Sequence, residues 1–118
     1  MTPEEFVKAV KIAVVRSSVD GTVSELAKPA GRRPAPELVE LSEWYKRLPP
    51  EDQKQLAAVV ARACRLATYG FLCVLDGLKA IEDAPDKGTL ELFHVSGEER
   101  THLNDPAQTF LSALFKDE

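Results

Sequence analysis

The sequence predicts an α+β fold that is mainly α: four to five helices packed around a long central helix, with one β-hairpin near the C-terminus. Apolar residues recur every three or four positions over most of the chain, as in helices that bury one face. Proline with nearby acidic residues begins several of these segments, which is typical of helix N-termini. From about residue 89 the pattern changes to a short run of β-forming residues.

The composition is that of a globular protein. The chain has 118 residues, of which 44% are hydrophobic and 29% are charged, close to the averages for folded domains. We therefore expect residues 1–118 to form a single globular domain. Polar residues directly follow Met1, and no run of about 18 apolar residues is present. These features favour a cytoplasmic protein that does not bind a membrane.

The first helix is expected to begin at Thr2 and Pro3, a capping hydroxyl followed by proline, and to reach about Ser17. A short second helix or a bent continuation then ends before Pro29. Residues 28–36 contain three prolines and a glycine, so this segment is predicted to be a loop.

A further helix is predicted from Glu37 to about Arg47. Its apolar residues at helical spacing should face the core: Leu38, Leu41 and Tyr45. Its glutamates repeat on the other side, where a basic partner could use them: Glu37, Glu40 and Glu43. The pattern leaves open whether Trp44, the only tryptophan, lies in the core or is an exposed anchor.

The long helix should begin near Glu51 and continue for about eight turns to Ile81, because apolar residues keep their helical spacing over that length. Between residues 69 and 78 it is apolar on nearly every side, which is typical of a helix inside a bundle. Cys64 and Cys73 lie nine positions apart in this helix. Their Cα atoms would then be about 13 Å apart, too far for a disulfide, so both should be thiols in the core.

The C-terminal third should contain a turn at residues 82–88, a strand at 89–95, a turn at 96–99 and a returning strand at 100–103. Asn104, Asp105 and Pro106 then resemble the start of a last helix. In that helix Phe110, Leu111, Leu114 and Phe115 would pack on the core.

Charge is distributed unevenly. Residues 1–75 carry a net charge of +2 and residues 76–118 carry −6, which argues against nucleic-acid binding because that requires clustered Lys and Arg. We expect a protein partner, which could be basic; size and charge suit an immunity-type inhibitor of a basic toxin or nuclease. The predicted binding residues are acidic: Glu82, Asp83, Asp86, Glu91, Glu98 and Glu99.

The alternative function is a small-molecule-binding domain or minor enzyme. Its pocket would lie near Asp76 and the hairpin, with Tyr69 and Trp44 as further members. Asp76 follows an apolar run, so burial could raise its pKa and make it a general acid or base. A hydrogen bond from a neighbouring helix end would instead give it a structural role.

No catalytic, metal or cofactor motif is recognisable. The acidic turn lacks EF-hand spacing, and no Gly-x-Ser-x-Gly is present. If Gly97 and Glu98 form the turn, His94 and His102 project from opposite faces, which excludes a shared metal. A register shifted by one residue would bring them to one face without a third ligand. The exposed hairpin edge leaves a homodimer open.

Overall fold

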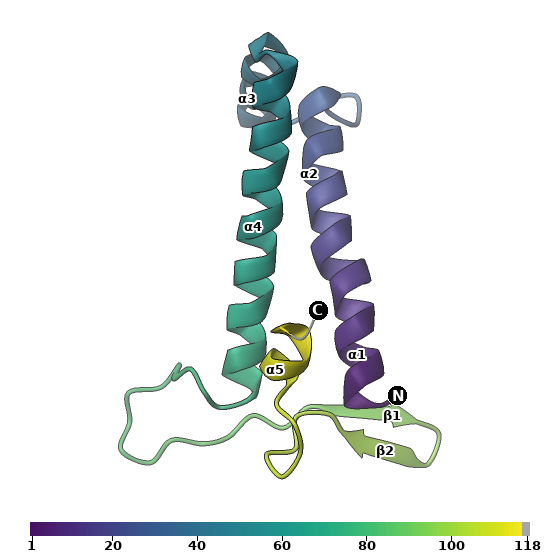
Figure 1. Ribbon diagram of the computed structural model, residues 1–118, viewed down its shortest axis with the longest axis vertical. Coiled ribbons are helices and arrows are strands. Elements are labelled where there is room, and N and C mark those ends of the chain that lie inside the picture. The colour runs from purple at the N-terminus through teal and green to yellow at the C-terminus, as the bar shows by residue number, and fades with distance from the viewer. Residues whose placement is uncertain (117–118) are drawn as a thin grey trace. The chain divides into compact units, whose positions relative to one another are not determined.

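The fold is α+β and mainly helical, in a computed structural model that describes residues 1–116 (Figure 1). The chain divides into two compact units. The hairpin unit combines Met1–Val14 with the chain from Leu66 onward, and the α3 unit is Val15–Arg65.

The N-terminal segment is helical from Pro3 to Ala27. It comprises α1 (Pro3–Val10), the π-helix η1 (Lys11–Arg16) and α2 (Ser17–Ala27). A capping box fixes its start: the Glu5 N–H donates to Thr2 Oγ1 and the Thr2 N–H donates to Glu5 Oε1, both at 3.1 Å. The predicted cap at Thr2 is therefore confirmed, and the chain continues as a helix beyond Ser17.

In the α3 unit, α3 (Pro36–Arg47) packs against α2. Its buried residues are Ser42 and Tyr45, and Ser42 Oγ donates a 2.7 Å hydrogen bond to the carbonyl of Leu26 at the end of α2. This contact sets which face of α3 turns inward. The prediction that Leu41 faces the core is wrong: its side chain is 51% exposed, because it lies about 100° around the helix from Ser42.

The long helix α4 is Pro50–Leu75 and runs through both units. The prediction that it reaches Ile81 is wrong. Gly77 has a φ of 78°, the Leu78 N–H donates to the Cys73 carbonyl at 2.9 Å, and the Gly77 N–H donates to the Val74 carbonyl at 3.1 Å. This Schellman motif ends the helix. Cys64 and Cys73 both lie in α4, where they are half-buried and not joined by a disulfide.

Most of α4 is incompletely covered by the rest of the protein. Leu72 is its one buried residue, whereas Phe71 is 62% exposed. The helix is therefore not enclosed by other helices, although its apolar sequence predicted that it would be.

By length and composition alone, α4 could cross a membrane. Soluble core helices pass the same test, and every 18-residue stretch of α4 includes Arg62 and Arg65. Each arginine at a bilayer centre would cost about 2.5–3.5 kcal/mol.

The hairpin consists of β1 (Phe93–Ser96) and β2 (Glu99–His102), paired antiparallel with Phe93 opposite His102. Gly97, at a φ of 60°, and Glu98 form the turn. This is the register in which the two histidines project from opposite faces. β1 is shorter than the predicted strand at 89–95, whereas β2 has the predicted length and begins one residue earlier.

The last helix, α5, is Leu111–Lys116 and packs against α1. The prediction that it begins after Pro106 is wrong, because residues 105–110 form a turn and irregular chain instead of a helix. Leu111 and Phe115 are buried, and Lys11 Nζ of η1 lies 5.4 Å from the centre of the Phe115 ring.

Candidate functional site

Asp76, directly after α4, holds the start of α5. Its Oδ1 accepts a 3.0 Å hydrogen bond from the Leu111 N–H, and its Oδ2 accepts a 2.8 Å hydrogen bond from the Ser112 N–H. A carboxylate is favourable there because the first N–H groups of a helix lack internal partners and carry partial positive charge. Asp76 therefore has the structural role that the sequence left open beside the acid–base one.

Asn104 joins three segments of the hairpin unit. Its Nδ2 donates to the carbonyls of Leu75 at 2.6 Å and Leu90 at 2.8 Å, and its Oδ1 accepts from the Leu92 N–H at 2.8 Å. The Asn104 side chain thus bonds the backbone of Leu90 and Leu92, just before β1, as a neighbouring strand would. It is only 7% exposed. The sequence prediction missed this role, since an Asn before Asp-Pro resembles a local helix cap.

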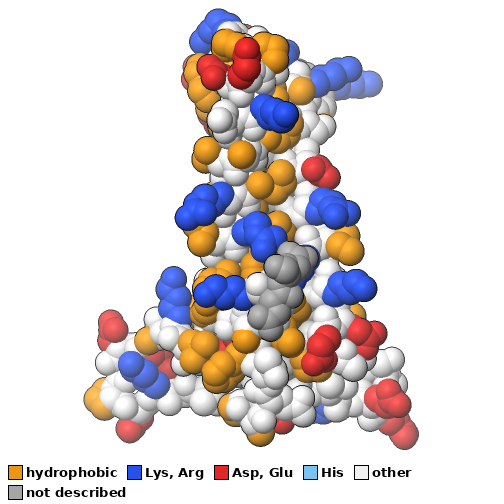
Figure 2. Space-filling model, in the orientation of Figure 1, with side chains coloured by type: hydrophobic (Ala, Val, Ile, Leu, Met, Phe, Trp, Pro, Cys, Tyr) orange, Lys and Arg blue, Asp and Glu red, His pale blue; other side chains and the backbone are white. Residues whose placement is uncertain are grey.

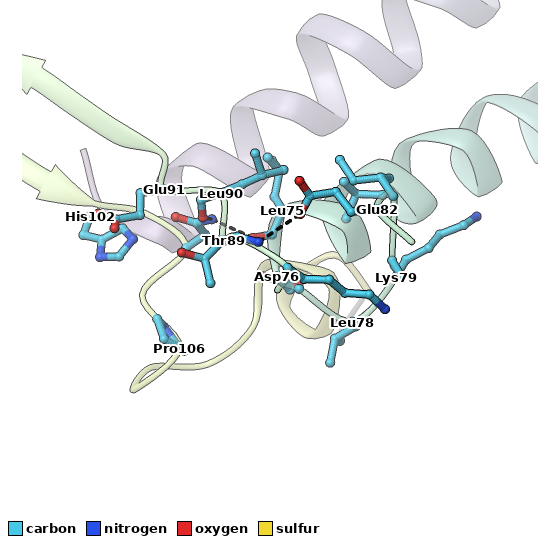
Figure 3. Close-up of a pocket in the computed structure, with 17 residues that line it drawn as sticks. Leu75, Asp76, Leu78, Lys79, Glu82, Thr89, Leu90, Glu91, His102 and Pro106 are labelled. Carbon is cyan, nitrogen blue, oxygen red and sulfur yellow. Dashed lines mark hydrogen bonds between the residues drawn. The ribbon is translucent and has the colours of Figure 1, made fainter. Parts of the chain in front are cut away.

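A half-open pocket of about 580 Å³ lies beside these two residues (Figure 3). Its walls are the end of α4, the loop that follows it, and part of β2. Among the lining residues are Lys79, Lys87, Glu82 and Glu91, so residues of both charge signs border the pocket. A pocket near Asp76 and the hairpin matches the position expected for the alternative function.

Two of the predicted pocket residues do not line it. The Tyr69 ring instead lies 6.5 Å from that of Phe115 in α5. The pKa of Tyr69 is raised by a hydrogen bond with Cys73 and by the charge of Cys73, and to a smaller extent by burial and the Asp76 charge. Trp44 belongs to the α3 unit.

His102 lines the pocket and stacks on Phe93, with ring centres 4.6 Å apart. Its Nε2 is buried and has no hydrogen-bond partner among the described residues. The guanidinium carbon of Arg100 lies 4.0 Å from the centre of the Phe93 ring.

The six predicted acidic binding residues are all exposed but do not form one patch. Glu82, Asp83 and Asp86 lie in the loop after α4, where Glu82 Oε2 accepts a 2.9 Å hydrogen bond from the Gly88 N–H. Glu98 and Glu99 lie at the hairpin turn. The loop and the turn extend in opposite directions, and acidic side chains gather at both (Figures 1 and 2).

An apolar groove of about 480 Å³ also lies in the hairpin unit, between the N-terminal helical segment and the end of α4. None of its eight lining residues is ionisable: Phe6, Val10, Val14, Ala67, Thr68, Phe71, Leu72 and Leu75. The sequence prediction assigned several of these residues to the core, since periodicity shows which residues share a face but not whether anything covers it.

The outward side of α3 is a further exposed apolar surface. Leu41 is 51% and Trp44 is 42% exposed, which answers the question that the sequence left open about the tryptophan. Glu37 and Glu40 lie on the same side, because positions three and four apart share a helix face. We call these four residues the α3 face.

Within the described residues, no group of three or more His, Cys, Asp or Glu could hold a metal ion. The chain was compared with known protein families, curated proteins and solved structures, and it matches none of them.

Proposed function

We propose that this protein is a binding module for a basic protein partner, and that the α3 face is its main contact. The observation that carries this proposal is the exposure of Trp44 beside Leu41 on α3, whose buried residues are Ser42 and Tyr45. Tryptophan is enriched among the residues that dominate the energy of protein interfaces. Contiguous exposed apolar surface on a folded protein commonly marks an interaction site.

The charge of the α3 face supports a basic partner. Leu41 and Trp44 are three positions apart, the spacing of anchors that dock a helix into an apolar groove. Glu37 and Glu40 lie beside them, and no basic residue occurs in the first two turns of α3. A groove rimmed by Lys or Arg would complement this pattern.

The acidic residues of the hairpin unit have a different role in this proposal. They lie at two separate places, so they do not supply a single contact patch, but a net charge of −6 over residues 76–118 would speed encounter with a basic protein. Inhibition of a basic toxin or nuclease in the cytoplasm, as by immunity-type proteins, is one function of this kind.

The test is affinity capture from the source cell with the native chain and with Trp44→Ala. Val59→Ala is the matched control, because Val59 is 64% exposed and lies in the same unit outside the α3 face. We expect one basic protein to be captured by the native chain and the control but not by Trp44→Ala. Equal capture by all three chains would overturn the proposed contact.

A second candidate function is small-molecule binding at the pocket beside Asp76, favoured by its volume of about 580 Å³ and its mixture of apolar and charged walls. A thermal-shift screen of metabolites would test it. A ligand of this pocket should lose affinity in Lys87→Met but not in Lys28→Met, which changes an exposed lysine in the α3 unit.

A further inference from the structure

We propose that the α3 face also pairs with a second copy of itself, in an antiparallel homodimer whose two α3 helices cover each other's Trp44. The inference rests on the proposed function in that both use the α3 face. It adds a self-associated state in which this face is closed to the basic partner. Protein concentration would then regulate the proposed binding site.

Charged residues of opposite sign lie at the two ends of the apolar centre of the α3 face. Glu40 directly precedes Leu41, and Arg47 follows Trp44 by three positions. Glu40 and Arg47 are seven positions apart, nearly two whole helical turns, so they lie on the same side of α3 about 10 Å apart along its axis. Both residues are exposed. Along this side, α3 is therefore acidic, then apolar, then basic.

This order of charge selects a partner that has the reverse order, and α3 has that order when it runs in the opposite direction. In an antiparallel pair related by a two-fold axis, Glu40 of each copy faces Arg47 of the other, and the apolar centres meet. Charges beside an apolar helix contact set the orientation and the choice of partner. A parallel pair would instead place Glu40 against Glu40, and an uncharged partner would leave both charges without a complement.

The packing within the α3 unit leaves this side of the helix available. Ser42 and Tyr45 are the buried residues of α3, and Ser42 bonds Leu26 at the end of α2. Trp44 lies about 200° around the helix from Ser42 and is 42% exposed. Mutual burial of Trp44 would supply most of the stabilisation. Because only one helix of each copy takes part, the contact is small and the dimer should be weak.

Sedimentation equilibrium over a wide concentration range tests the inference by exchanging charges. We expect the mass of the native chain to rise from 13.0 kDa towards twice that value. Arg47→Glu and Glu40→Arg each place like charges opposite one another, so each should raise the dimer dissociation constant about tenfold or more. The double variant with both changes restores opposite charges and should dimerise again.

Lys46→Glu is the matched control for Arg47→Glu. Lys46 is exposed in the same last turn of α3, but it lies about 200° around the helix from Trp44. This variant makes the same change of charge outside the contact, so it should dimerise as the native chain does. Circular dichroism would confirm that every variant keeps the native helical content.

The fluorescence of Trp44 locates the contact, because it is the only tryptophan. Its emission should move to shorter wavelength as the native chain dimerises. A native chain that stays at 13.0 kDa at every concentration would overturn the inference. So would a dimer that forms without a change in Trp44 emission, or a folded double variant that stays monomeric.

The dimer and the proposed function can fail separately. Arg47→Glu leaves Leu41, Trp44 and the glutamates of the α3 face unchanged, so it should still capture the basic protein. Capture of that protein by a native chain that never dimerises would refute only the dimer. A native chain that dimerises through Trp44 but captures no basic protein would refute only the proposed partner.

Discussion

At the residue scale, Asp76 is the carboxylate whose removal should be most informative. Asp76→Ala removes both hydrogen bonds to the start of α5, and loss of a helix cap typically costs about 0.5–2 kcal/mol of unfolding free energy. Denaturant unfolding measures this loss. Asp86→Ala, in an exposed loop, should change stability by less than about 0.5 kcal/mol. Equal effects of the two variants would contradict the capping role.

Asn104 should tolerate even an isosteric change poorly. In Asn104→Asp an ionised carboxylate would face the Leu75 and Leu90 carbonyls, to which the amide now donates. Leaving buried groups unpaired costs about 1–3 kcal/mol each, so we expect a loss in that range or above at neutral pH by chemical denaturation. The control is Gln108→Glu, the same type of change at an exposed position, which should be nearly neutral.

Glu5 connects the N-terminal capping box to pH. The hydrogen bond from the Thr2 backbone, then that from the Thr2 side chain, lowers the pKa of Glu5 from its ordinary value of 4.5. A carboxyl with a lowered folded-state pKa stabilises the fold above its unfolded pKa, and the contribution disappears as pH falls through the folded value. NMR titration of Glu5 should show the lowered pKa in the native chain and a higher one in Thr2→Val. Because Thr2→Val keeps the backbone N–H, an unchanged pKa in the variant would contradict the contribution of the Thr2 side chain.

At the scale of elements, two glycines should respond oppositely to alanine. Gly77 adopts a positive φ of 78° to end α4, where a Cβ costs about 1–2 kcal/mol. Gly21 lies inside α2 with nothing within 4 Å of an added Cβ, so alanine should stabilise this helix by about 0.5–1 kcal/mol. Thermal unfolding should therefore show a lower Tm for Gly77→Ala and a higher Tm for Gly21→Ala. A shift in the same direction for both would contradict this assignment.

The elements also show what the sequence could and could not predict. The capping box at Thr2 and the hairpin turn at Gly97 depend on residues a few positions apart, and both were predictable. The bonds from Ser42 to Leu26 and from α5 to Asp76 span 16 and at least 35 positions. No local pattern shows such contacts. They explain why the burial of Leu41 and the start of α5 were predicted wrongly.

At the scale of the whole molecule, net charge and apolar anchors should act on different rate constants of partner binding. Charges distant from the contact mainly change association, whereas anchors in the contact mainly change dissociation. We therefore expect the association rate with the captured basic protein to fall about tenfold or more between low and high salt. Glu98→Gln combined with Glu99→Gln should weaken this salt dependence, because these exposed charges contribute to the acidic field of the C-terminal part of the chain.

Trp44→Ala should instead raise the dissociation rate, by about 30-fold if the tryptophan contributes roughly 2 kcal/mol as a typical interface anchor does. Surface plasmon resonance of the native chain and both variants would separate the two effects. A Trp44 variant altered only in association would mean that the α3 face guides encounter without being buried in the complex. Association independent of salt would exclude a basic partner, and the α3 face would then have to bind through Leu41 and Trp44 alone.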